Sequence, residues 1–243
     1  MNSTWFLHLL PILCIWLAGG LIAIVRWHRH PGVCALVVLS IVTMIAATSA
    51  THIAVQYFTR SNSPVLVQQY LAMTGLVNML LRTIAWGAIL TAVFGWRPAP
   101  IGVARPMLQF SIRGLLTLTL AVALLCAAGR AIVGWLGGVS QYWISIVDDL
   151  PMAICWLCGV WIAIRRWPAH PPVSAIALAA IALSAASFLA FHLVWMSNLN
   201  SGTIYLVQWA SLLSGIIAPI VWALLLAAAL GWRADATAAA QSA

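Results

Sequence analysis

The sequence contains no lysine and no glutamate; eleven arginines and three aspartates are the only charged residues among its 243 amino acids. Charged residues therefore make up 6% of the chain, whereas soluble domains carry about a quarter. Hydrophobic residues make up 64%, which excludes a disordered chain as well as a soluble globular fold. The composition predicts an integral membrane protein.

These absences also exclude several functions. Without lysine there is no Schiff base, no retinal or pyridoxal attachment and no phosphate-loop lysine. Without glutamate, the carboxylates of Asp148, Asp149 and Asp235 are too few to favour a proton relay across a membrane. No Ser/His/Asp set and no metalloprotease helix is present, so we expect no catalytic residues and no enzyme. The five cysteines lie in apolar runs and do not form the framework of a secreted disulfide protein.

What the sequence does contain is a series of long apolar stretches, each close to the roughly 20 residues that a membrane helix needs. Seven such spans are predicted, at residues 5–26, 32–57, 65–94, 112–136, 148–165, 173–196 and 204–230. The fourth opens with the segment 110–116, which resembles a short Phe-Ser-Leu/Ile-Arg segment that begins membrane spans in many otherwise unrelated bacterial proteins. That resemblance implies a bacterial inner membrane.

The net charge of +8 reflects membrane topology, because the arginines punctuate apolar runs and form no basic patch. We expect no nucleic-acid partner. Eight arginines fall in loops or a tail on one side of the predicted bundle, at positions 26, 29, 97, 105, 113, 165, 166 and 233, and only Arg60 and Arg130 on the other. Since cytoplasmic loops are enriched in arginine, the N-terminus is predicted outside and the C-terminus in the cytoplasm.

An internal repeat organises the spans. Residues 10–39 match residues 150–179 at 14 of 30 positions, and the offset of 140 continues to Gly75 and Gly215 before it becomes 136. We therefore predict an all-α integral membrane fold of seven transmembrane helices, with two parallel three-helix repeats joined by a linker helix in a 3+1+3 plan. The predicted parts are a first repeat at 1–97, a loop and linker helix at 98–140, a second repeat at 141–233 and a cytoplasmic tail at 234–243.

The plan resembles that of the SWEET-type sugar carriers in helix count and orientation, and parallel repeats of this kind occur in transporters. The resemblance and the duplicated polar residues suggest a small-solute carrier or solute-binding membrane subunit, with a site between the repeats. A b-type haem or metal protein is the alternative, and a non-catalytic assembly or sensory subunit is the third. The lipid bilayer is the expected partner; a homo-oligomer and a membrane partner subunit stay open.

Candidate site residues come mostly in symmetric pairs. His52 and His192 each lie 21 residues beyond the proline that opens their helix. They could hold haem as two axial ligands, bind a metal together with His8, take part in solute binding, or simply bond to water or backbone at the interface. Otherwise we expect no cofactor. Gln68 and Gln208 begin spans 3 and 7 and could bind a ligand or link helices.

The remaining candidates are two aspartates, two tryptophans and an asymmetric pair. Asp148 and Asp149 are expected at an outer helix start, as helix caps or as part of a polar vestibule. Trp16 and Trp156 are expected to pack in mid-helix or to line a solute pathway. Arg82 is the one charge well inside a span, and it either extends towards the inner interface or binds an anionic group. Asn78 lies one turn before it and is also without a polar counterpart.

Overall fold

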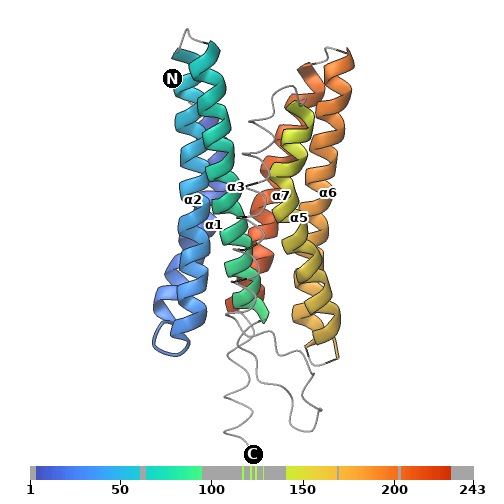
Figure 1. The fold of residues 1–243 in the computed structure, drawn as a ribbon. Helices are drawn as coiled ribbons and strands as arrows, with labels where there is room; N and C mark the ends of the chain where they lie inside the picture. The colour runs from blue at the N-terminus through green and yellow to red at the C-terminus, as the bar shows by residue number, and fades with distance from the viewer. Residues whose placement is uncertain are drawn as a thin grey trace, which may run out of the picture. The chain divides into compact units, whose positions relative to one another are not determined.

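The computed structural model describes residues 4–60, 64–94, 141–168, 170–201 and 204–230, together with residues 117, 121, 124 and 128. None of the described residues forms a strand. Most of the predicted fourth span, at 112–136, lies outside them. The long helices are α1 (Thr4–Val25), α2 (Pro31–Arg60), α3 (Pro64–Phe94), α5 (Gln141–Arg166), α6 (Pro171–Ser201) and α7 (Ile204–Leu230), shown in Figure 1.

Four of these helices are long and apolar enough to cross a membrane, which supports an integral membrane protein. The spanning segments within the described residues are Pro31–Ala54, Thr74–Phe94, Pro171–Val194 and Leu212–Leu230, and α1 has a shorter apolar segment at Leu9–Val25. An α-helix is suited to lipid because it satisfies its backbone hydrogen bonds internally. Large apolar side chains such as Leu17, Leu21 and Leu193 are exposed on the helices, as expected of surfaces that contact lipid. The seven-helix arrangement stays a prediction.

The turns that precede α2 and α6 lie at equivalent positions of the sequence repeat and have the same backbone hydrogen bond. Both helices begin at a proline, a residue favoured in the first helical turn because its missing N–H has no partner to lose. The His30 carbonyl accepts a hydrogen bond from the amide of Cys34 at 3.1 Å, and the His170 carbonyl accepts one from Ser174 at 3.1 Å. The same sequence pattern therefore produces the same local geometry twice.

The chain divides into two compact units, which are described separately. The first comprises residues 1–34 and 159–243, and the second comprises residues 35–158. The first unit thus contains α1, α6 and α7, whereas the second contains α3, most of α2 and the first part of α5. In terms of the sequence repeat, each unit has the second and third helices of one copy and the first helix of the other.

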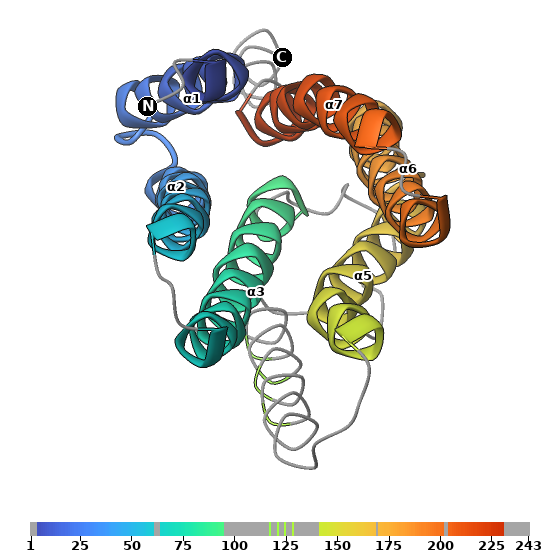
Figure 2. The same cartoon turned by 90° about the horizontal axis from the view of Figure 1, so that it is seen from above.

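In the first unit, α7 packs against both α1 and α6 (Figure 2). The α1–α7 contact begins with an edge-to-face pair of Trp16 and Trp222, whose ring centroids are 5.9 Å apart at 89°. It continues where Gly19 faces Leu226. Near the ends of both helices, the Arg26 guanidinium donates a hydrogen bond to the carbonyl of Leu230. The contacts advance together along both chains, so α1 and α7 are parallel.

The second unit repeats this arrangement with α3 and α5. Trp86 and Trp156 form an edge-to-face pair at 5.9 Å and 80°. Because Trp156 is the repeat equivalent of Trp16, and Trp86 that of Trp222, the two pairs are duplicates. The hydroxyl of Ser40 on α2 donates a buried hydrogen bond of 2.9 Å to the carbonyl of Ala85 on α3. Polar side chains commonly join membrane helices in this way.

Candidate functional site

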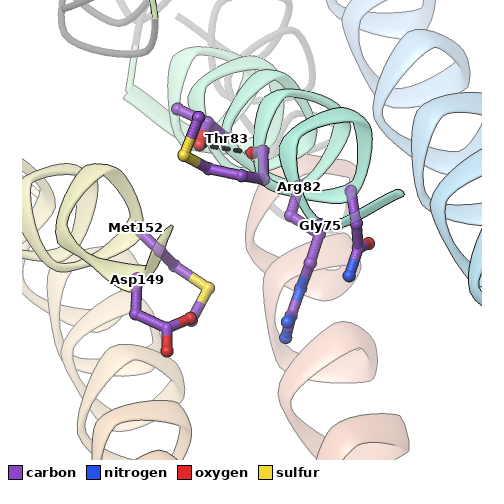
Figure 3. Close-up of a pocket in the computed structure, with 7 residues that line it drawn as sticks. Gly75, Arg82, Thr83, Asp149 and Met152 are labelled. Atoms are coloured by element: carbon purple, nitrogen blue, oxygen red, sulfur yellow. Dashed lines mark hydrogen bonds between the residues drawn. The ribbon is translucent and has the colours of Figure 1, made fainter. Parts of the chain in front are cut away.

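A pocket lies between α3 and α5 in the second unit, with a cavity of about 170 Å³. Its wall on α3 consists of residues spaced three and four apart, which share one face of a helix. The lining residues are Gly75, Asn78, Met79, Arg82 and Thr83 on α3, and Asp149 and Met152 on α5 (Figure 3). Trp86 and Trp156 are each one turn beyond this lining, so the tryptophan pair joins the two helices directly past the pocket.

Two opposite charges define the chemistry of this pocket. Arg82 extends from α3 and Asp149 from α5 into the same space (Figure 3). The Asp149 carboxylate interacts electrostatically with the Arg82 guanidinium. Such an interaction is stronger within apolar helices than in water because the local dielectric constant is lower. Arg82 lies within the candidate span Thr74–Phe94, where a charge without an opposite charge nearby is costly.

The other polar groups of the pocket differ in their availability. The Thr83 hydroxyl donates a 2.7 Å hydrogen bond to the Met79 carbonyl of its own helix, so its proton is already used. The Asn78 amide offers both donors and an acceptor and lies one helical turn from Arg82. Gly75 contributes no side chain and leaves space at this end of the wall. Arg82, Asp149 and Asn78 are consequently the groups most suited to contact a bound molecule.

The structure corrects one prediction about this site. Asp148 and Asp149 were expected at a helix start, where an aspartate can act as a cap, but α5 already begins at Gln141. Asp149 is thus more than two turns inside the helix, and the capping interpretation is wrong. The predicted span began at residue 148, and α5 extends seven residues further towards the N-terminus, through the mostly apolar segment 141–147.

Arg82 lies deep within α3 and shares its pocket with Asp149 of α5. It lies 18 residues after the start of α3 at Pro64 and 12 residues before its end at Phe94, or about 18 Å from that end at 1.5 Å per residue. Its partner Asp149 could not be inferred from either helix alone. The sequence treated the two residues as separate candidates, and the structure brings them together.

The equivalent positions of the α1–α7 pair are apolar. Leu9 and Ile12 stand where α5 has Asp149 and Met152, and Ala218 stands where α3 has Asn78. The tryptophan pairs nevertheless have the same centroid separation and similar interplanar angles in both units. The polar lining is therefore a specific property of the α3–α5 copy and is not needed to hold a pair of these helices together.

Trp16 and Trp156 lie in packed surroundings, with 2% and 6% of their surfaces exposed. Each one contacts a tryptophan of the third helix of the other repeat. The Trp16 indole N–H is buried and, within the described ranges, has no hydrogen-bond partner. This low exposure is typical of side chains that pack helices together. A role for Trp16 and Trp156 in lining a solute pathway stays a prediction.

The two symmetric histidines have different partners. The Nε2 of His52 lies 2.9 Å from the Nε2 of Gln56 one turn later. His192 packs on the rings of Phe188 and Phe191, at centroid distances of 4.3 and 6.4 Å. Among the residues that the structure describes, no group of three or more histidine, cysteine or acidic residues could hold a metal ion. The haem alternative stays a prediction, and a Soret band lost in His52→Ala or His192→Ala is its test.

The remaining candidates are described only by their backbone. Gln68 and Gln208 each lie four residues after the start of their helix, at Pro64 and Ile204, which agrees with their equivalence in the repeat. His8 and Asp148 lie within α1 and α5. The side chains of these four residues lie outside the described part of the structure.

The described helices and their charged pocket define an apolar helical membrane protein with a polar site. Comparisons with protein-family models, with known proteins and with solved structures find no match for this chain.

Proposed function

We propose that this protein binds a small polar solute in the α3–α5 pocket and carries it across the membrane. The observation that supports the proposal is the presence of Arg82, Asp149 and Asn78 in one cavity, whose α3 wall lies within the candidate span Thr74–Phe94. Ionisable groups within membrane segments are costly and typically mark a substrate or ion pathway. Here they line a space large enough for a ligand.

A purely structural role for these two opposite charges is the competing explanation, and the equivalent helices α1 and α7 argue against it. The α1–α7 pair has apolar residues such as Leu9 and Ile12 at the equivalent positions and forms the same tryptophan contact. Replacing opposite charges inside a protein with apolar residues is often neutral or stabilising. Two charges that the helix packing does not require are better explained by ligand binding.

The origin of the two pocket walls supports transport in particular. In the predicted repeats, α3 is the last helix of the first copy and α5 the first helix of the second. Carriers built from repeats place their solute sites near the bilayer midplane, where elements of the two repeats meet. We propose the same relation here, in a bacterial inner membrane with the C-terminus in the cytoplasm, the side on which the arginine-rich loops fall.

The test is a solute screen on the purified protein. Thermal unfolding in detergent is measured with sugars, amino acids, organic acids, amines and inorganic anions, and the stabilising solutes are then assayed for flux into proteoliposomes. We expect at least one class to raise the unfolding temperature and to be transported. Arg82→Gln should abolish both effects. Arg165→Gln changes an exposed arginine that is not among the lining residues, and it should preserve both.

The proposal is refuted if no solute class stabilises the folded wild-type protein. It is also refuted if a stabilising solute acts equally on wild-type and a folded Arg82→Gln variant, since binding would then be independent of the pocket. Asn78→Ala provides a variant without a charge change. We expect it to weaken the same solute by roughly three- to tenfold, the loss of about one hydrogen bond.

A further inference from the structure

We infer that the solute is a small zwitterion of the amino-acid type, whose carboxylate contacts Arg82 and whose ammonium contacts Asp149. This inference rests on the proposed function, because it names the chemical class of ligand for the same pocket. It follows from the charge, the geometry and the size of the site, taken in turn.

The first step is charge. Among the described lining residues, Arg82 and Asp149 contribute one charge of each sign and the others are neutral, so these residues together carry no net charge. An anion that took over the Arg82 guanidinium would leave the Asp149 carboxylate without its partner, and a cation on Asp149 would leave Arg82 in the same position. Both side chains are only partly exposed, so leaving either charge without an opposite charge nearby is unfavourable. A zwitterion satisfies both groups and adds no net charge to the pocket.

The second step is geometry. The two charged side chains come from different walls, Arg82 from α3 and Asp149 from α5, and extend into one cavity (Figure 3). A ligand that contacts both must therefore carry its own charges at opposite ends. The planar guanidinium fork matches a carboxylate with two parallel hydrogen bonds. The Asp149 carboxylate only accepts hydrogen bonds when ionised, so it matches the donors of an ammonium group.

The third step is size. The cavity of about 170 Å³ is well above the roughly 10–15 Å³ that a single water molecule needs. That space is sufficient for a small amino acid. Met79 and Met152 complete the lining, and flexible thioether side chains of this kind adapt to small apolar groups of variable shape. The pocket thereby offers two charged contacts and a soft apolar surface.

The test compares ligands that differ by one charged group. Alanine carries both charges, propionate lacks the ammonium group and ethylamine lacks the carboxylate; glycine and serine are further zwitterions of similar size. Binding to the purified wild-type protein is measured by calorimetry and by thermal unfolding. We expect at least one of the three zwitterions to bind, and propionate and ethylamine to bind about tenfold to a hundredfold more weakly, since each loses a charge-assisted contact.

Two variants assign the contacts. In Arg82→Gln, the zwitterion should no longer bind more tightly than ethylamine. In Asp149→Asn, it should no longer bind more tightly than propionate. Asp235→Asn is the control, because it makes the same chemical change in the predicted cytoplasmic tail. It should leave the affinities for all these ligands unaltered. The ligand series on the wild-type protein decides the question even where a variant does not fold.

The outcomes separate the two proposals. If a singly charged or uncharged solute binds through the pocket while glycine, alanine and serine do not, the ligand class is wrong and the proposed function stands. The class is equally wrong if alanine, propionate and ethylamine bind alike. If no solute of any class binds, both proposals fall.

Discussion

Gly19 on α1 provides the sharpest test of the helix packing, because Gly20 beside it is a matched control. A Cβ atom added at Gly19 would lie 2.6 Å from Cδ1 and 3.0 Å from Cδ2 of Leu226 on α7, whereas one added at Gly20 meets no described atom within 4 Å. Both substitutions to alanine remove a glycine from the same helix, a gain of up to about 1 kcal/mol. That gain cancels when the two variants are compared.

What remains is the cost of overpacking at Gly19. Leu226 is buried, with 6% of its surface exposed, so it cannot simply turn away from the new methyl group. Forcing an extra methyl into a packed contact typically costs about 1–3 kcal/mol. We therefore expect Gly19→Ala to be less stable than Gly20→Ala by about 1–3 kcal/mol, or roughly five- to 150-fold in the unfolding equilibrium.

The assay is reversible unfolding in mixed detergent micelles, followed by far-UV circular dichroism. Leu226→Ala removes the three atoms that would lie nearest to the new methyl group. In that background Gly19→Ala should no longer destabilise, which gives a coupling free energy of about 1–3 kcal/mol in a double-mutant cycle. Equal stability of Gly19→Ala and Gly20→Ala would refute the packing of α1 on α7, as would a loss that persists in the Leu226→Ala background.

Three further predictions concern packing and topology. The losses of unfolding free energy in Trp16→Leu and Trp222→Leu should be non-additive by about 0.5–1.5 kcal/mol, the value of an edge-to-face pair. Additive losses would contradict that contact. Trp27→Leu is the control expected to be additive with Trp222→Leu, because it lies eleven residues and about 16 Å from Trp16 along the helix direction. Ser40→Ala should lower the free energy of unfolding by about 0.6 kcal/mol, the typical value of an interhelical hydrogen bond in a membrane, and an unchanged stability would show that this bond contributes nothing. A fluorescent protein fused after Ala243 should fluoresce and alkaline phosphatase fused there should be inactive, since the C-terminus is predicted in the cytoplasm; the reverse pattern would overturn the orientation.

The sequence was informative wherever the repeat supplied two copies to compare. It predicted the helix starts at Pro31 and Pro171 and the equivalence of Trp16 with Trp156, and the structure has α2 and α6 beginning at these prolines. It did not predict that Trp16 contacts Trp222. Helices in lipid are apolar on the faces that pack and on the faces that do not, so periodicity gives little indication of which helix meets which.

The candidate site was predicted residue by residue but not as a site. Arg82, Asn78 and Asp149 were all singled out because polar groups are rare in this chain. Their convergence depends on which helix lies beside α3, and on the extension of α5 back to Gln141. An apolar run marks the part of a helix that lies in lipid, and it does not mark where the helix begins.

The exchange of first helices between the repeats has a consequence for biosynthesis. The partner of α1 is α7, and 178 residues separate Val25 from Ile204. At about 5–20 residues per second, translation takes roughly 10–40 s to cover that distance. During this time α1 lies in the membrane without its final partner, because Leu226, the side chain that packs against Gly19, has not yet been made. The first three helices therefore cannot mature as a finished module when they leave the ribosome. The second unit is complete once residue 158 has been made, whereas the first unit must wait for α7.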